Sequence, residues 1–306
     1  MGAGAGASAV VFAYHDVGVR CLEVLVEGGV DVRLVATHHD DPRENLFFAS
    51  VRKAAIVHGL EVEAPADPNA PAFLARLQAI APDFIFSFYY RRMLSPAILA
   101  TARRGAFNMH GSLLPHYRGR APVNWAVLRG ERETGATLHE MVDKPDAGRI
   151  VGQQAVPIGA DDTAGEVFAR VTAAAEAVLR RELPRLLEGS AVLVPQDLSR
   201  GSYFGGRRPE DGRIDLGRPA GEVHDLVRAV APPYPGAFLD HAGGVLKVLR
   251  TRRLGAMGAG RAPGVRCDGA RLLLDCGDGA TLEALEIEYA GEALSPAAFC
   301  QTRGSR

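Results

Sequence analysis

Three polar side chains in the middle of the chain have the types and the spacing that acyl transfer to an amine requires. Asn108 and His110 stand two residues apart in the segment AFNMH, which predicts a strand, and Asp146 follows in the turn DKPDAG. Because side chains of a strand alternate between its faces, Asn108 and His110 are expected on one face. By spacing alone, however, each of the three could equally be a hydrogen-bonded structural group or a turn residue.

The three groups would cover different parts of such a reaction. An amine that attacks a carbonyl carbon loses a proton, and histidine can accept it because its ordinary pKa is about 6.5. A neighbouring carboxylate favours the imidazolium form and raises that pKa. The amide N–H of Asn108 can donate to the oxyanion, a contribution worth about 10²- to 10³-fold in rate. This chemistry needs no serine or cysteine nucleophile and no metal.

The elements around these residues predict an α/β fold. Apolar runs predict strands at 9–14, 30–37, 84–89, 106–110, 135–141 and 150–156. Helical patterns cover 18–27, 48–58, 73–80, 97–102 and 164–187, the last broken or bent near Pro184. Such alternation predicts a parallel sheet with helices on both faces, in which ligands bind at the carboxyl ends of the strands. The end of strand 106–110 is therefore the expected site.

The composition of the sequence changes near Gln196, and a second, mostly β domain is expected after that point. Gly, Pro and Arg become frequent, and strand-like runs follow at 246–250, 271–275 and 281–287. The segment CGDGA between the last two runs reads as a hairpin turn. We predict a catalytic domain over residues 1–203 and a smaller β domain over residues 204–306.

Composition and charge exclude several classes of protein. The chain has 306 residues, a net charge of −1 and 47% hydrophobic residues, which are ordinary values for a globular protein. Such a charge predicts no general attraction to nucleic acid. The N-terminal segment has no basic region and only a short apolar run, so neither a signal peptide nor membrane insertion is expected. A cytoplasmic location follows as a prediction.

Cysteine and histidine spacing predicts neither a disulfide framework nor a metal site. Four cysteines are scattered without the spacing CxxC, which favours a reducing compartment. His38 and His39 are neighbours, so their side chains would point to opposite faces of a strand and would not share a metal. His139 lies inside a predicted strand and is interpreted as a structural, hydrogen-bonded residue.

At these residues the sequence resembles the formyltetrahydrofolate-dependent formyltransferase family. The matching pieces are NMH, then GSLLP, YRGRAP and DAG, in that order. The resemblance implies a Rossmann-like parallel-sheet catalytic domain and a C-terminal open β-barrel of the oligonucleotide-binding-fold (OB) type. It also implies 10-formyltetrahydrofolate as the formyl donor. By position it makes His110 the general acid/base, Asn108 the oxyanion stabiliser and Asp146 the group that raises the pKa of the histidine.

Within that family the resemblance is strongest to the formyltransferase domains of bifunctional polymyxin-resistance enzymes, and it covers nearly the whole chain. Those domains formylate UDP-4-amino-4-deoxy-L-arabinose for lipid A of lipopolysaccharide. The resemblance implies folate contacts at Arg92, Met93, Leu94, Arg120, Val142, Asp143, Lys144, Pro145 and Asp146. Asp143, Lys144 and Pro145 differ in type from the family residues. The decarboxylase half of the bifunctional enzymes has no counterpart here, so it is expected as a separate partner protein unless this chain is one half of such an enzyme.

Two other functions compete with formylation of a UDP-amino sugar. A methionyl-tRNA formyltransferase shares fold and donor but needs a positive surface. Here the segment THHDDPRENLFFAS is acidic, although the arginine pairs at 207–208 and 252–253 fit either a diphosphate or solvent. A non-catalytic module that binds folate or a UDP-sugar would not need Asn108, His110 and Asp146 together. We therefore expect a small-molecule acceptor and no nucleic-acid partner.

Overall fold

The chain folds into two compact units, each built from segments that are not contiguous in sequence. The computed structural model describes residues 6–41, 45–241, 243–255 and 260–303. The first unit comprises Met1–Gly119, Thr134–Val156 and Ala169–Phe204, and the second comprises Arg120–Glu133, Pro157–Phe168 and Gly205–Arg306. Two inner segments, 120–133 and 157–168, thus pack with the C-terminal third of the chain.

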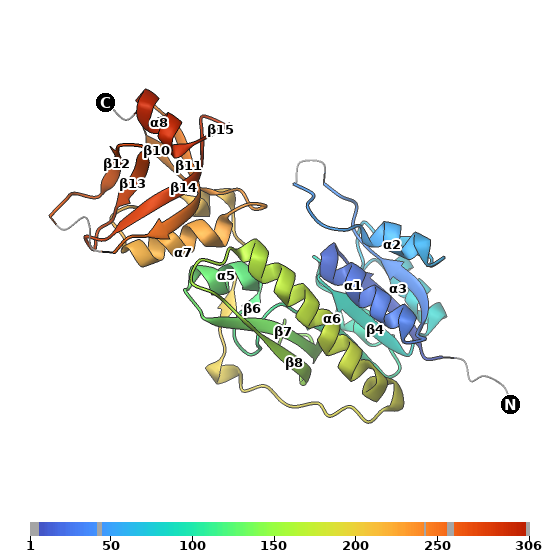
Figure 1. The fold of residues 1–306 in the computed structure, drawn as a ribbon. Coiled ribbons are helices and arrows are strands. Elements are labelled where there is room, and N and C mark those ends of the chain that lie inside the picture. Colours follow the sequence, from blue (N-terminus) through green and yellow to red (C-terminus); the bar gives the residue numbers. More distant parts are fainter. Residues whose placement is uncertain (1–5, 42–44, 242, 256–259, 304–306) are drawn as a thin grey trace. The chain divides into compact units, whose positions relative to one another are not determined.

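The first unit is built on a seven-stranded sheet in the order β3-β2-β1-β4-β5-β7-β8 (Figure 1). The strands are β1 (Ser8–Ala13), β2 (Asp31–Ala36), β3 (Val62–Glu63), β4 (Phe84–Phe88), β5 (Gly105–His110), β7 (Glu133–Glu140) and β8 (Ile150–Pro157). The first five pair in parallel, whereas β5 and β7 pair antiparallel. This order confirms the predicted Rossmann-like sheet.

Helices cover both faces of this sheet, as the alternating pattern predicted. They are α1 (His15–Glu27), α2 (Val51–Val57), α3 (Pro71–Ile80), α4 (Pro96–Leu99) and α6 (Ala164–Glu188). On one face, Val10, Phe12 and Ile85 pack with Phe73 of α3 and Ile98 of α4. Helices α1 and α6 lie side by side in Figure 1.

Helix α6 is not broken at Pro184. We expected a break or a bend there, because proline cannot donate to the preceding turn. The helix is continuous to Glu188, which excludes the break. Leu183 and Leu186 on either side of the proline are buried. Packing of these side chains offsets the lost hydrogen bond, so the helix runs on. None of the helices within the described residues is long and apolar enough to span a membrane.

The second unit contains an antiparallel sheet in the order β10-β11-β14-β13-β12, with β15 beside β14. Its elements are α5 (Pro122–Leu128), α7 (Ala220–Val230), β10 (Ala237–His241), β11 (Gly244–Arg253), β12 (Gly264–Asp268), β13 (Arg271–Asp275), β14 (Thr281–Tyr289), β15 (Glu292–Leu294) and α8 (Pro296–Arg303). Strands β13 and β14 pair as neighbours in sequence, so the predicted hairpin is confirmed. Val227, Leu272 and Phe299 are fully buried in its core.

Short elements complete the chain. Strands β6 (Arg118–Gly119) and β9 (Tyr203–Phe204) pair in parallel within the first unit. The 3-10 helices η1 (Leu198–Arg200) and η2 (Pro209–Gly212) lie before and after β9. The pairing of β6 with β9 holds the loop after β5 in place.

The cysteines depart from the sequence-based expectation. Cys267 of β12 and Cys300 of α8 form a disulfide, with their Cα atoms 5.6 Å apart, so the expectation of no disulfide is wrong. The two residues are 33 positions apart. Packing of α8 on the sheet through Phe299 brings them together, and their spacing in the sequence carries no sign of it. Cys21 and Cys276 are free and buried.

Candidate active site

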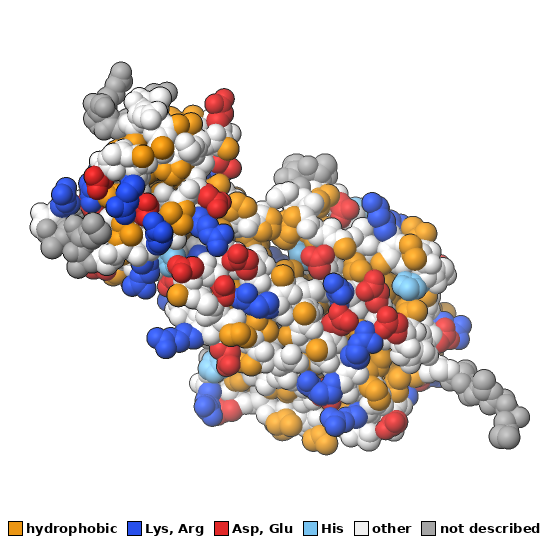
Figure 2. All heavy atoms as spheres, in the orientation of Figure 1, with side chains coloured by type: hydrophobic (Ala, Val, Ile, Leu, Met, Phe, Trp, Pro, Cys, Tyr) orange, Lys and Arg blue, Asp and Glu red, His pale blue; other side chains and the backbone are white. Residues whose placement is uncertain are grey.

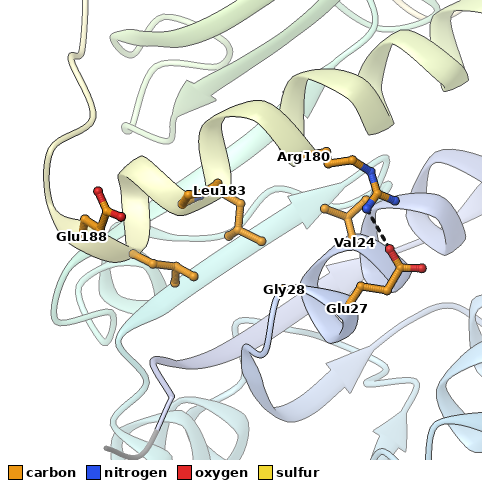
Figure 3. Close-up of a pocket in the computed structure, with 8 residues that line it drawn as sticks. Val24, Glu27, Gly28, Arg180, Leu183 and Glu188 are labelled. Carbon is orange, nitrogen blue, oxygen red and sulfur yellow. Dashed lines mark hydrogen bonds and ion pairs between the residues drawn. The ribbon is translucent and has the colours of Figure 1, made fainter.

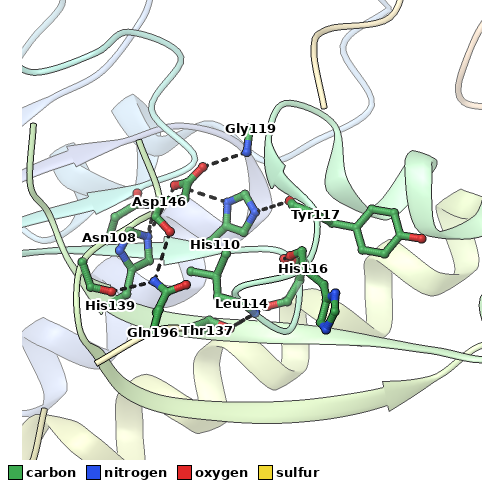
Figure 4. Close-up of polar contacts among 12 residues, drawn as sticks. Asn108, His110, Leu114, His116, Tyr117, Gly119, Thr137, His139, Asp146 and Gln196 are labelled. Carbon is green, nitrogen blue, oxygen red and sulfur yellow. Dashed lines mark hydrogen bonds and ion pairs between the residues drawn. The ribbon is translucent and has the colours of Figure 1, made fainter. Parts of the chain in front are cut away.

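The structure brings the predicted polar residues together on the face of the sheet that α3 and α4 cover. Asn108 and His110 lie on the same face of β5 as Ala106, which belongs to the apolar core of that face. Asp146 lies in the turn between β7 and β8, and its Oδ1 atom is 3.6 Å from His110 Nδ1 (Figure 4). His110 is 6% exposed. The result is a buried histidine–carboxylate pair beside a carboxamide.

His139 links Asn108 to this pair, a role that sequence reasoning missed. Its Nε2 atom is 3.1 Å from Asn108 Nδ2 and 3.5 Å from Asp146 Oδ1. The ring is buried and hydrogen-bonded, as expected of a structural histidine, but its partners are the predicted catalytic residues. The antiparallel register of β5 and β7 places His139 directly opposite Asn108. Only the register reveals this, because the two residues are distant in sequence.

The loop after β5 holds the His110 ring from the other side. His110 Nε2 is 2.8 Å from the carbonyl oxygen of Tyr117. That oxygen can only accept a hydrogen bond, so Nε2 carries a proton in this arrangement. Tyr117 has a φ of 57°, and its N–H donates to Ser202 Oγ at 2.8 Å. The loop conformation therefore aims a backbone carbonyl at the histidine.

The turn that carries Asp146 is held in an uncommon backbone conformation. Asp146 has a φ of 51°, in the left-handed region that non-glycine residues rarely adopt. Gln196 Nε2 donates to the carbonyl oxygens of Asp146 and Gly148, at 3.0 and 2.6 Å. A Cβ atom on Gly148 would lie 1.9 Å from the oxygen of Glu140, so this position requires glycine. Such local strain is typical of functional sites.

Asp146 is a carboxylate at neutral pH. Burial raises the pKa of its carboxyl group, but the neighbouring imidazoles of His110 and His139 and the Gly119 N–H together outweigh burial. The pKa therefore lies well below its usual range. The Gly119 N–H donates to Oδ2 at 2.9 Å, which leaves Oδ1 facing the two histidine rings. A fixed negative charge thus stands beside His110.

The folate contacts expected after β4 are only partly accessible. Arg92 and Met93 are exposed, Met93 by 59%. The Met93 carbonyl accepts from Asn69 Nδ2 at 2.9 Å, which fixes this segment. Leu94 is buried in the core beside Val10 and Phe12, so its side chain is unavailable to a ligand.

The contacts expected after β7 lie on the same face of the sheet. Met141, which precedes them, packs against the core that contains Leu94. Val142 is 40% exposed, and Asp143 and Lys144 are also exposed. Arg120 is exposed and belongs to the second compact unit. The segments 92–94 and 142–146 therefore border one apolar cluster, next to the polar residues of β5.

An aromatic cluster beyond the ends of β1, β2 and β4 was not anticipated from the sequence. His15 stacks on Phe48 with ring centroids 4.1 Å apart, and His38 stacks on Tyr90 at the same distance. Tyr14 meets His38 edge to face, at 5.2 Å. His15 has a φ of 68°. Burial lowers the pKa of His15 to about 4, with Asp16 opposing the shift and Arg91 adding to it.

A shallow cavity of about 320 Å³ lies elsewhere, between the end of α1 and the end of α6 (Figure 3). Glu27 and Arg180 form an ion pair at its rim, with 2.8 Å between Oε2 and Nη1. Because α1 begins directly after β1, its last turn lies at the amino edge of the parallel sheet. The cavity is thus far from the carboxyl end of β5 and contains none of the predicted catalytic residues.

Charges of both signs occur on the face of the molecule that Figure 2 draws. Acidic and basic side chains are interspersed there. The histidine pair 38–39 does not form a metal site, because His38 Nε2 accepts the backbone N–H of Arg91 at 3.0 Å. Within the part of the chain that the structure describes, no cluster of three or more His, Cys, Asp or Glu side chains suits a metal ion.

Comparison with known proteins agrees with this architecture. Solved structures of several formyltransferases, among them the following three, have a similar fold. The sugar 3N-formyltransferase WlaRD, with dTDP and 5-N-formyl-THF, has 18% identity and a TM-score of 0.72, covering 92% of this chain and 98% of its own. The Helicobacter canadensis N-formyltransferase, with folinic acid and dTDP-3-aminofucose, has 19% identity, a TM-score of 0.72 and coverages of 90% and 98%. A Francisella tularensis 4-N formyltransferase has 18% identity, a TM-score of 0.63 and coverages of 79% and 96%.

Family models match both parts of the sequence. Residues 12–183 match the formyl transferase family, and residues 207–304 match the C-terminal domain of formyl transferases. The first match covers more than half of the chain, so the resemblance to formyltransferases is confirmed at the level of the family. The protein is therefore an enzyme of the formyl transferase family.

Proposed function

We propose that this enzyme transfers the formyl group of 10-formyltetrahydrofolate to the amine of a nucleotide-linked amino sugar, UDP-4-amino-4-deoxy-L-arabinose. The observation that carries the proposal is the buried His110–Asp146 pair beside the Asn108 amide at the end of β5. The similar structures named above contain formylated folates and dTDP or a dTDP-amino sugar, which supports a folate donor and a sugar-nucleotide acceptor. Formylation of this sugar would serve modification of lipid A.

The residues present fit a folate-type donor. Exposed apolar side chains at Met93 and Val142 offer surface for a flat ring, and both segments border the same apolar core. Arg92 carries positive charge for the glutamate carboxylates of such a donor. Leu94 would contribute only through its backbone, since its side chain is buried. The donor supplies the formyl carbon, and the polar residues of β5 supply the proton transfer.

Each polar residue then has a distinct task. Asn108 Nδ2 donates to the oxygen that becomes negative when the amine attacks the formyl carbon. His110 takes the proton that the amine loses, and the Asp146 carboxylate balances the imidazolium charge. As the bond between the formyl carbon and N10 of the donor breaks, the imidazolium would return this proton to N10, so that tetrahydrofolate leaves and His110 is neutral again. Acceptance at Nε2 requires that the other ring proton sits on Nδ1, facing Asp146. It also requires the ring to leave the Tyr117 carbonyl, to which Nε2 now donates.

A direct acceptor assay tests the proposal. The purified protein would be incubated with 10-formyltetrahydrofolate and, in separate reactions, UDP-4-amino-4-deoxy-L-arabinose, dTDP-3-aminofucose or initiator methionyl-tRNA, with products read by mass spectrometry. We expect a formamide on the UDP-sugar, and at least about 10²-fold slower formation of it with the His110→Ala variant. Product only on the dTDP-sugar or only on the tRNA would refute the acceptor. Sugar binding without any product, over hours and with fresh donor, would favour the non-catalytic module.

The tRNA alternative has weaker support. Acidic and basic groups are interspersed on the face of Figure 2, whereas binding of tRNA phosphates requires a positive surface. In the second unit, the guanidinium of Arg207 lies 4.9 Å from the ring centre of Trp125, and Arg252 pairs with Glu283. Each of the arginine pairs 207–208 and 252–253 thus has one member in contact with another side chain of the protein. Residues 42–44 of the acidic loop lie outside the described residues.

A further inference from the structure

We propose that His139 is a positioning residue, which orients the side-chain amide of Asn108 so that an N–H faces the reacting carbonyl oxygen. The kinetic tests of this inference rest on the proposed function, whereas the NMR test described below does not. His139 is 2% exposed and lies on β7, directly across from Asn108 on β5. Its ring makes contacts at both nitrogen atoms, and these contacts determine which atom of Asn108 can face it.

A backbone carbonyl selects the tautomer of His139. Nδ1 is 2.8 Å from the carbonyl oxygen of Glu140, which can only accept, so Nδ1 carries a proton. In the neutral ring, Nε2 then has a lone pair and can only accept. Asn108 Nδ2, at 3.1 Å, is the nearest donor to it. An amide turned by 180° would place its oxygen against that lone pair, and the two acceptors would repel each other.

This chain of contacts leaves one Asn108 hydrogen for catalysis. The amide nitrogen carries two hydrogens, of which one is donated to His139 Nε2. The second remains for an oxygen that develops negative charge. Without the His139 acceptor, the amide is free to turn and to present its own oxygen, which would repel an oxyanion. The benefit of Asn108 thus depends on His139, although His139 touches no reacting atom.

Charged neighbours do not replace this role. Asp146 Oδ1 is 3.5 Å from His139 Nε2, which is longer than an ordinary hydrogen bond, so the Asn108 amide is the closer partner. His110 faces the same carboxylate oxygen from 3.6 Å. A main-chain carbonyl contacts each ring, that of Tyr117 at His110 Nε2 and that of Glu140 at His139 Nδ1. Only the His139 ring directs its other nitrogen at Asn108.

The test compares His139→Leu with His139→Gln. Leucine removes the acceptor, and we expect kcat to fall about 10²-fold, with KM for both substrates near the original value, because a misplaced group costs about that factor. Glutamine can present an acceptor oxygen to Asn108 and should restore part of kcat. His224→Leu is the matched control. His224 is equally buried in the second unit, with Nδ1 2.8 Å from Thr251 Oγ1, so its loss should reduce stability but spare kcat.

Two further measurements decide between positioning and mere structural support. In an Asn108→Ala background, His139→Leu should cost little additional rate, because the group that it orients is already absent. An equal loss of rate in both backgrounds would overturn the proposal. NMR of the Asn108 side-chain amide needs no substrate. It should show faster hydrogen exchange in His139→Leu than in the parent protein, and no change in the control variant His224→Leu. Unchanged exchange in a folded variant would also refute the role, whereas a wrong acceptor sugar would leave this readout intact.

Discussion

The His15 side chain provides a quantitative test of the structure through pH. His15 follows β1, its side chain is 13% exposed, and its ring stacks on Phe48. Burial lowers the pKa of His15 to about 4, against about 6.5 in an unfolded chain. The unfolded chain therefore binds a proton first as the pH falls. The contribution of His15 to the free energy of unfolding is therefore lost as the pH falls from about 6.5 to about 4. Below about pH 4, His15 causes no further loss of stability.

The expected magnitude follows from the two pKa values. The difference between the pKa of about 4 in the folded protein and about 6.5 in the unfolded chain corresponds to about 3.4 kcal/mol of stability across the whole pH range between them. At pH 5 the unfolded chain is almost fully protonated at this residue and the folded chain is not. The loss relative to pH 7.5 is then about 2 kcal/mol. This contribution adds to those of all other titrating groups.

Urea unfolding of the protein and of His15→Asn isolates the contribution. Asparagine does not titrate and tolerates the left-handed backbone that His15 adopts, with φ 68°. Between pH 7.5 and pH 5.0, the variant should lose about 2 kcal/mol less of its free energy of unfolding than the parent. His15→Gln should change the pH dependence equally, even if its absolute stability is lower. Parallel curves for parent and both variants would show that this histidine is not held neutral by burial.

Other predictions concern the site and the second unit. His110→Ala should lower kcat by about 10²- to 10⁴-fold with little change in KM, measured by formamide release, since proton transfer is lost only in the transition state. Asp146→Asn should also lower kcat. In the parent protein, kcat should not fall through protonation of Asp146 between pH 5 and 8, because the pKa of Asp146 lies far below this range. Reduction of Cys267–Cys300 should lower the free energy of unfolding by about 4 kcal/mol, as the 33-residue separation implies. Four reactive thiols in unreduced, unfolded protein would contradict the disulfide.

Local patterns in the sequence were enough to predict most elements of the first unit and the candidate residues of the site. Apolar runs marked β1 and β4 because strands buried on both faces need continuous hydrophobic side chains. The two-residue spacing of Asn108 and His110 placed both on one face of β5, since alternation is a property of any strand. The ordered motifs around them indicated the family. All of this information is local, so it could be read without coordinates.

Tertiary structure alone decided which distant residues join those elements. His139 reaches Asn108 because β7 pairs antiparallel with β5 in one register, and a shift by one residue would turn its ring to the other face. Cys300 meets Cys267 because Phe299 anchors α8 on the second sheet. Leu94 is buried because its side chain packs in the hydrophobic core with Val10 and Phe12. Register and packing depend on the burial of apolar surface by the whole chain, and no segment carries that information by itself.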